Sequence, residues 1–230
     1  DIAHMCYRTG DMIKALSWAE KALELARRLN ASEIIASSYA SLGTIFGFTG
    51  DMKKAVECLE RALKIALDYG YMDTALRTYA NLAWNLPEEE NEKALEYYKK
   101  GLELAEKVGD ISMISWIGTS LAGAYVGIGD MDKAVSLAKE SIALDRKAGD
   151  LAHLSTSLST LGGAYQVLGE WNKSEQYYME ALSISQRLND FQSIKNSHGH
   201  LGRLHFDKGE YAKAREFFEK MYEILEKAGA

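Results

Sequence analysis

The side chains in this chain that could take part in chemistry include a group of histidines close to residue 200. His198 and His205 are seven residues apart and would share one face of a helix, whereas His200 would lie on another. No Cys or acidic residue has helical ligand spacing with the first pair. Because zinc sites use three or four converging ligands, we expect no metal site here.

Catalytic arrangements are not recognisable elsewhere in the sequence. No nucleophile stands at a familiar spacing from a base and an orienting acid, and the glycines do not form a phosphate-binding loop. The sequence therefore predicts a protein that is not an enzyme and that uses no cofactor.

The elements that position these side chains follow a repeat of 40 residues. Each unit has an aliphatic residue, then a Gly followed by an acidic residue, and then a small residue, at fixed distances. The Gly-acidic pairs are Gly10-Asp11, Gly50-Asp51, Gly129-Asp130, Gly169-Glu170 and Gly209-Glu210. One further unit lies around Leu82 and Ala94, shortened by one residue at Pro87-Glu88-Glu89-Glu90. A period of this length is typical of stacked supersecondary units that share a continuous core.

Each unit has the pattern of two helices. Leu154, Leu158, Leu161 and Tyr165 have the spacing of one helical face, and Gly169 follows as a helix terminator. A second amphipathic run then extends to Leu188, followed by residues suited to a helix cap. We therefore expect one array of six helix pairs over residues 1–230, with units at 1–29 (partial), 30–69, 70–108, 109–148, 149–188 and 189–230.

Composition excludes several classes of protein. The net charge of −6 argues against nucleic acid as a partner, since phosphate backbones need clustered Lys and Arg. Cys6 and Cys58 fall on apolar stripes, which indicates core thiols in a reducing compartment. No apolar run approaches the length of a membrane span and no signal peptide opens the chain, so we expect a cytoplasmic location and no membrane partner. Because Asp1 begins partway into a repeat, we expect the chain to be a piece of a longer protein.

The repeat resembles the tetratricopeptide repeat family. The resemblance rests on Leu161-Gly162-Gly163-Ala164-Tyr165 with Gly169, Ser174, Tyr178 and Ala181, and on Leu42-Gly43, Phe46, Gly50, Ala55 and Ala62. The common repeat has 34 residues, and longer units such as these are similar to those of kinesin light chains, spindle-orientation adaptors and the sensor regions of maltose-regulator-type activators and related ATPases. The resemblance implies an all-α, right-handed superhelical solenoid in which the first helix of each pair lines a concave groove.

By this resemblance, one stripe along each first helix faces the groove. The stripes include the small residues Gly123 and Gly163, and they contain no Asp or Glu. The groove is therefore expected to be neutral to mildly basic. The candidate binding residues are Ser41, Thr44, Arg77, Asn81, Trp84, Trp116, Thr119, Ser120, Thr160, Gln166, Asn196, His200 and Arg203.

Two interpretations of these stripes are open. In the first they bind a polar or acidic partner, with Arg77 and Arg203 on carboxylates and Trp84 and Trp116 as apolar anchors. In the second the small residues only let helices approach closely, and the Trp residues fill gaps. Glycines admit a partner's backbone in the first interpretation and tight helix packing in the second.

The last helix carries more apolar surface than one neighbour can cover. Its apolar residues are Tyr211, Ala214, Phe217, Phe218, Met221, Tyr222 and Leu225. Either this face is exposed because the chain is cut there, or copies of the chain associate through it.

The sequence thus favours a scaffold without catalytic activity that binds a peptide segment or a partner domain in its groove. The alternative function is the effector-sensing part of a larger signal-transduction ATPase or transcriptional regulator.

Overall fold

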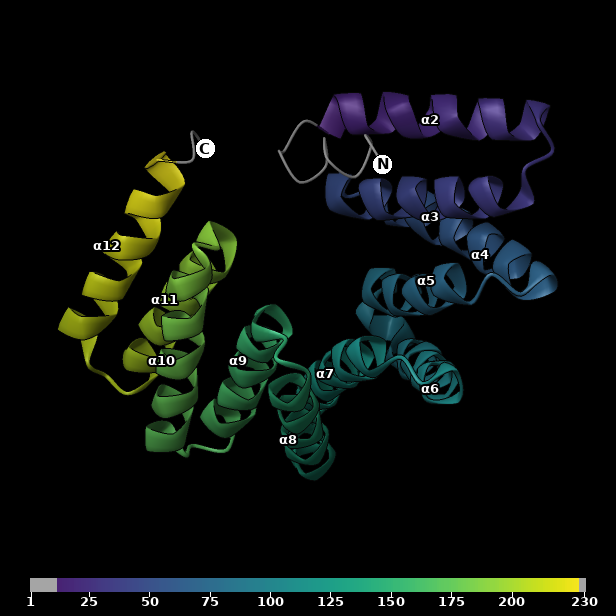
Figure 1. The fold of residues 1–230 in the computed structure, drawn as a ribbon. Helices are drawn as coiled ribbons and strands as arrows, with labels where there is room; N and C mark the ends of the chain where they lie inside the picture. Colours follow the sequence, from purple (N-terminus) through teal and green to yellow (C-terminus); the bar gives the residue numbers. More distant parts are fainter. Residues whose placement is uncertain (1–11, 228–230) are drawn as a thin grey trace. The chain divides into compact units, whose positions relative to one another are not determined.

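The computed structural model describes residues 12–227, which form eleven α-helices, α2 to α12, and no strands (Figure 1). The all-helical fold predicted from the sequence is confirmed. The chain divides into two compact units, Asp1–Gly109 and Asp110–Ala230. The predicted positions Ile2, Cys6, Gly10 and Asp11 lie outside the described residues.

The first unit contains α2 to α6. The helices are α2 (Met12–Arg28), α3 (Ser32–Thr49), α4 (Met52–Tyr69), α5 (Met72–Asn85) and α6 (Asn91–Val108), with a 3₁₀ turn, η1 (Glu88–Glu90). α3 packs on α4 and α5 packs on α6, while α3 and α5 also contact each other. The shortened unit predicted at Pro87 appears as the short helix α5 followed by η1.

The second unit contains three helix pairs. They are α7 (Ile111–Ile128) with α8 (Met131–Ala148), α9 (Leu151–Val167) with α10 (Trp171–Leu188), and α11 (Phe191–Asp207) with α12 (Tyr211–Lys227). The first helices form a row in which α9 contacts both α7 and α11 (Figure 1). A side chain on one face of α9 can therefore reach both neighbouring first helices.

The turns between helices form as the repeat predicts. Gly50, Gly129 and Gly169 have φ of +87°, +84° and +73°, a left-handed conformation that favours glycine at a helix C-terminus. The following acidic residue starts the next helix, and the side chain of Asp130 accepts a hydrogen bond from the backbone N–H of Lys133. Asp190 likewise caps α11 after the left-handed Asn189.

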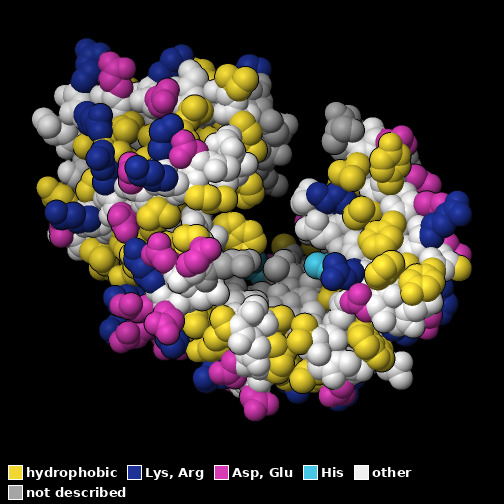
Figure 2. All heavy atoms as spheres, turned by 180° about the vertical axis from the view of Figure 1, so that it is seen from behind, with side chains coloured by type: hydrophobic (Ala, Val, Ile, Leu, Met, Phe, Trp, Pro, Cys, Tyr) yellow, Lys and Arg dark blue, Asp and Glu magenta, His cyan; other side chains and the backbone are white. Residues whose placement is uncertain are grey.

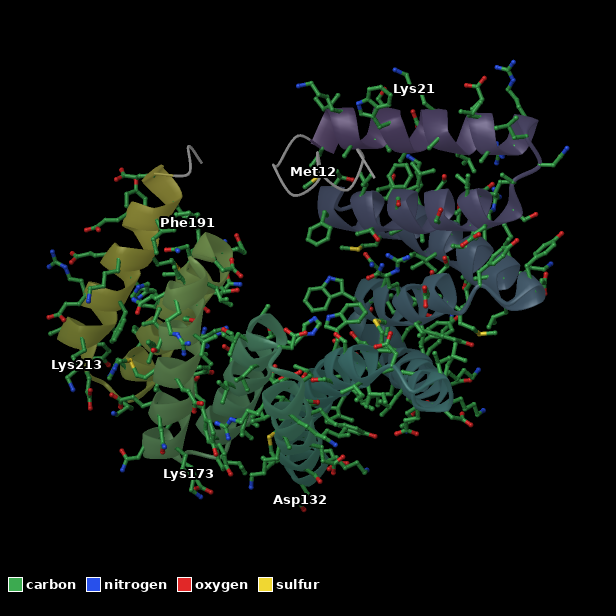
Figure 3. The ribbon with its side chains drawn as sticks, in the orientation of Figure 1. Met12, Lys21, Asp132, Lys173, Phe191 and Lys213 are labelled. Atoms are coloured by element: carbon green, nitrogen blue, oxygen red, sulfur yellow. The ribbon has the colours of Figure 1, made fainter. Side chains whose placement is uncertain are left out.

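At the start of three second helices, a lysine makes the same two contacts, one with the acidic residue before the helix and one with an aromatic ring of the preceding helix. We call this arrangement the lysine clasp. Lys133 Nζ lies 2.6 Å from Asp130 Oδ2 and 5.2 Å from the ring centre of Tyr125 on the preceding helix. Lys54 and Lys173 make the same pair of contacts, with Asp51 and Phe46 and with Glu170 and Tyr165. Lys173 and Lys213 both lie on the first turn of their helices (Figure 3). Ion pairs this exposed contribute little to stability, so the clasp fixes geometry more than stability.

In the last pair a histidine replaces the clasp's aromatic residue. His205 Nδ1 lies 2.9 Å from Glu210 Oε2, and its ring stacks on Phe217 at 5.3 Å. Lys208 bridges Glu210 and Glu175 at 3.2 and 3.0 Å. Hydrogen bonds from Lys213, His205 and Lys208 lower the pKa of Glu210 to about 2.

The core lies inside each pair and between neighbouring pairs. Leu158 and Leu161 of α9 are fully buried, as are Leu59 and Leu82 in the first unit. Gly162 lies directly beneath Tyr178 of α10, because a Cβ at this glycine would be 2.8 Å from the tyrosine ring. Burial of each such leucine contributes roughly 1.5–3 kcal/mol.

Candidate functional site

The second unit contains a cleft of about 300 Å³ beside its row of first helices. α9 supplies its centre, α7 and α11 supply its sides, and Tyr178 reaches it from α10. The lining residues are Gly123, Val126, Ser155, Thr156, Ser159, Thr160, Gly163, Tyr178, Ser193, Asn196 and His200. Most of these belong to the stripes predicted to face a groove, and three of them, Thr160, Asn196 and His200, were named as binding residues.

Two hydroxyl groups at the centre of the cleft have their protons engaged within α9. Ser159 Oγ donates to the carbonyl of Ser155 at 3.0 Å, and Thr160 Oγ1 donates to that of Thr156 at 3.2 Å. Each oxygen keeps lone pairs that can accept a further hydrogen bond. The centre of the cleft therefore presents acceptors, which suit N–H donors such as the amides of a peptide.

The other wall of the cleft is aromatic and uncharged. The ring of His200 lies flat on Tyr178, with centroids 5.1 Å apart, and its outer face stays exposed. Burial against Tyr178 lowers the pKa of His200, which favours the neutral imidazole. No Asp, Glu, Lys or Arg lines the cleft. It favours an uncharged, polar ligand surface.

The glycines of this unit fall into two kinds. A Cβ on Gly123 would meet nothing within 4 Å, and one on Gly163 would be 3.4 Å from the Tyr178 hydroxyl, an ordinary contact. At Gly162 and Gly202 a Cβ would instead collide with Tyr178 and Phe218. Helix packing thus explains Gly162 and Gly202, but it does not explain Gly123, whose missing side chain widens the cleft.

A buried carboxylate links α7, α8 and α9. Asp145 of α8 is 2% exposed and accepts hydrogen bonds from Ser115 of α7 and, at 2.7 Å, from Ser157 of α9. Thr119 joins the network through a 2.7 Å contact with Ser157. The equivalent positions in other repeats hold Ala66, Ala105 and Ser185. This network was not predicted from the sequence. An alignment of the repeats with one another would have shown an aspartate where the other repeats have no acidic residue.

Several predicted binding residues contact other parts of the second unit instead of the cleft. Thr119 is 5% exposed and belongs to the Asp145 network. Gln166 accepts a hydrogen bond from Tyr178 Oη and donates to Asp207 at 2.7 Å, and Asp207 also pairs with Arg203 at 3.3 Å. Trp116 is partly buried, and its carbonyl accepts a bond from Ser120. The cationic side chain of Arg203 is therefore neutralised within its own helix.

The remaining predicted residues lie in the first unit. Asn81 Nδ2 donates to Thr44 Oγ1 at 3.0 Å and so links α5 to α3. Arg77 is exposed and donates to the carbonyl of Asp73 in its own helix, and Trp84 is 74% exposed. Ser41 is half-buried on α3. These residues offer a cation and a large apolar ring to solvent.

Comparison with known families decides what kind of array this is. The sequence model of the tetratricopeptide repeat matches residues 1–68 and 153–227, more than half of the chain. The chain belongs to the tetratricopeptide repeat family. None of the curated protein sequences compared with it is a significant match.

Solved structures show the same fold for this tetratricopeptide repeat chain. BtubC from P. vanneervenii is 19% identical, with a TM-score of 0.74, and the match covers 95% of this chain and 92% of that one. A Rap protein complexed with Competence and Sporulation Factor is 14% identical, with a TM-score of 0.78 and coverage of 99% and 74%. A signal-transduction ATPase with a tetratricopeptide repeat sensor, from Pyrococcus horikoshii, is 18% identical, with a TM-score of 0.74 and coverage of 98% and 35%.

Three further features of this tetratricopeptide repeat protein concern metal binding, thiol chemistry and membranes. Within residues 12–227, no three His, Cys, Asp or Glu side chains converge so as to hold a metal ion. Cys58 is a free, half-buried thiol in the core of the first unit, where burial raises its pKa. α7 is long and apolar enough to cross a membrane by length and composition, with a mean hydropathy of 1.4, although the sequence reasoning had found no such run. Its buried face packs on α8 and α9.

Proposed function

We propose that this tetratricopeptide repeat protein recognises a peptide segment or a partner domain through the cleft of its second unit. The observation that carries the proposal is Gly123. It is a glycine inside a helix that packing does not require, at the edge of a cleft lined with hydrogen-bond acceptors. A glycine in a helix interior costs about 0.5–1 kcal/mol relative to alanine, so its presence here favours a role in binding.

Similar structures support a peptide ligand. A Rap protein was solved with Competence and Sporulation Factor, and a Rap conjugation gene regulator of the plasmid pLS20 was solved with the Phr* peptide. These proteins share the fold with this chain over nearly its whole length, at TM-scores of 0.78 and 0.73. They support a peptide as a ligand for a helical array of this kind.

We infer that the peptide is polar and that its part in the cleft carries no charge. The cleft has no cation to pair with a carboxylate, and Arg203 is already paired with Asp207. A preference for acidic residues at the first unit would rest on Arg77, which is exposed there. We further propose that the protein is cytoplasmic, uses no cofactor, has no catalytic activity, and binds neither nucleic acid nor membrane. Families of this fold are generally non-catalytic, which supports that view.

The second candidate is a sensor that binds a small effector for a larger signalling protein. The similar sensor from Pyrococcus horikoshii supports it, as does the small volume of the cleft. Thermal shift against a metabolite panel distinguishes the two candidates, because a ligand of the folded state raises the Tm.

The test of peptide recognition uses two glycines of α7. A Cβ added at Gly123 or at Gly127 would meet nothing within 4 Å, but only Gly123 lines the cleft. The whole chain, Gly123→Leu and Gly127→Leu are each panned against a random peptide library. We expect peptides that bind the wild type and Gly127→Leu and that fail to bind Gly123→Leu. Peptides retained equally by both variants would show that the cleft is not the binding site.

A further inference from the structure

Two arginine side chains converge on one phenol in the first unit. Arg27 of α2 donates a hydrogen bond from Nη2 to Tyr39 Oη of α3, and Arg61 of α4 donates from Nη1 to the same oxygen at 3.4 Å. The guanidinium carbons also lie 5.5 and 5.8 Å from the centre of the tyrosine ring. Tyr39 itself is 8% exposed, whereas both arginines are exposed. Three helices therefore bring two positive charges to one point of the surface.

No carboxylate neutralises this pair within the described part of the chain. Neither arginine forms an ion pair there, and Glu57, one helical turn from Arg61, acts on it only at a distance. Burial of the ring opposes ionisation of Tyr39, but the hydrogen bonds from Arg61 and Arg27 outweigh it and lower the pKa of the phenol. Figure 2 shows Lys and Arg side chains over the visible face of this unit, with Asp and Glu side chains among them. Two positive charges with no ion-pair partner among the described residues are therefore held close together in a protein whose net charge is −6.

In the second unit, the positions equivalent to Arg27 and Arg61 hold an arginine and a glutamate, which form an ion pair. Arg146 is equivalent to Arg27 because each lies twelve residues after the small residue of its second helix, Ala134 or Ala15. Glu180 is equivalent to Arg61, six residues after Ser174 or Ala55. Arg146 Nη2 lies 2.8 Å from Glu180 Oε1, and the residue at the position of Tyr39 is Leu158.

The first unit thus has a second arginine where the second unit has the counter-ion, and a phenol where the second unit has a leucine. Like charges placed together in this way repel each other unless an anion joins them. A carboxylate would balance one of the two charges, whereas a phosphoryl group carries about −1.5 to −2 at pH 7. Its three oxygens also match the fork of donors on each guanidinium.

We propose that Arg27, Arg61 and Tyr39 form a binding site for a phosphoryl oxyanion. The two guanidinium groups bind its oxygens, and the phenolic O–H donates a third hydrogen bond. The site lies in the first unit and is independent of the peptide cleft proposed above. The phosphoryl group belongs either to a free phosphate or to a phosphorylated side chain of a peptide, and the same residues recognise both.

The decisive variant is Arg61→Glu in the whole chain, which gives the first unit the charge arrangement of Arg146 and Glu180. Inorganic phosphate is titrated into the protein at constant ionic strength set with chloride, and the Tm and the Nε–Hε resonances of Arg27 and Arg61 are followed by differential scanning fluorimetry and NMR. We expect phosphate to raise the Tm of the wild type and to shift both resonances. Arg61→Glu should bind phosphate at least tenfold more weakly, and its Tm in phosphate-free buffer should be higher than that of the wild type.

Matched controls separate the site from general charge effects. Arg187→Glu makes the same change in charge at an exposed position of the second unit and should keep the phosphate response. Tyr39→Phe should weaken binding less than Arg61→Glu because it removes one donor and no charge. A response of equal size in the wild type and Arg61→Glu, or no response of the wild type to phosphate beyond that to chloride, would overturn the proposal.

A second arm identifies the source of the phosphoryl group. A phosphoserine peptide and its unphosphorylated form are titrated beside inorganic phosphate. Tighter binding of the phosphopeptide than of phosphate assigns the site to phosphorylated partners, and equal binding assigns it to the free anion. If neither the phosphopeptide nor phosphate binds, the site does not exist.

Discussion

Replacing Gly123 with alanine should stabilise the protein, whereas the same replacement at Gly162 should destabilise it. Both glycines lie inside first helices, at α7 and α9, so alanine gains about 0.5–1 kcal/mol of helix propensity at either position. At Gly123 the new Cβ meets nothing within 4 Å, so no steric cost opposes the gain in helix propensity. For a chain of this length that corresponds to a rise in Tm of about 2–4 °C per kcal/mol.

At Gly162 the packing term outweighs the propensity term. The Cβ would lie 2.8 Å from two ring carbons of Tyr178, whose side chain is 2% exposed and stacks on His200. Overpacking of this kind costs about 1–3 kcal/mol. After subtraction of the helix propensity, we expect Gly162→Ala to lose up to about 2.5 kcal/mol.

Urea unfolding followed by circular dichroism measures both changes, with Gly127→Ala as a third variant outside the cleft. A loss of stability in Gly123→Ala would mean that this glycine is packed against something, and the argument for an open cleft would fail. A gain of stability in Gly162→Ala would refute the account of the contact with Tyr178. Any peptide selected by the cleft should bind Gly123→Ala less tightly, although the variant is more stable.

Three further predictions concern buried and exposed groups. Asp145→Asn should lower the free energy of unfolding by about 1–3 kcal/mol, because the amide cannot accept from both Ser115 and Ser157, and denaturant titration against Asp132→Asn on the exposed face of α8 measures the loss. The pKa of Glu210, about 2 when folded and about 4.3 when unfolded, means that its contribution is complete above about pH 5 and is lost as the pH falls toward 2. Melting curves from pH 7 to pH 3 should therefore fall more steeply for the wild type than for Glu210→Gln, and parallel curves would contradict the assignment. The apolar groove beside α12, where Tyr211 and Tyr222 are 66% and 60% exposed, predicts association of copies at high concentration. Sedimentation should show it weakened in Tyr222→Glu, and a wild type that stays monomeric would exclude it.

The helices could be predicted from the sequence because local chemistry determines them. The Gly-acidic pairs give left-handed C-terminal residues and N-caps at the predicted places, and the shortened unit at Pro87 gives the short helix α5. These features depend on residues within one turn of each other. Because these residues recur every 40 residues, the ends of the helices can be located in each repeat without knowledge of the tertiary contacts.

The site could be predicted only in part, because its chemistry depends on contacts between repeats. The stripe pattern found the cleft residues Thr160, Asn196 and His200, but it could not tell whether the stripe glycines Gly123 and Gly163 admit a partner or tight helix packing without the position of the neighbouring helix. The pairing of Arg203 with Asp207 is an i, i+4 contact that the sequence does contain. The convergence of Arg27 and Arg61 joins residues 34 apart, and only an alignment of the repeats with one another could have shown it.

The buried Asp145 also restricts how the array can be rearranged. Its hydroxyl donors come from the helix before it and the helix after it, so three consecutive helices from two repeats share one polar network. If recombination placed α8 beside a first helix with alanine or leucine at the position of Ser115, as at Ala36 and Leu76, the carboxylate would be buried with a donor missing. Helices α7, α8 and α9 must therefore be duplicated, deleted or transplanted together, whether by evolution or by design.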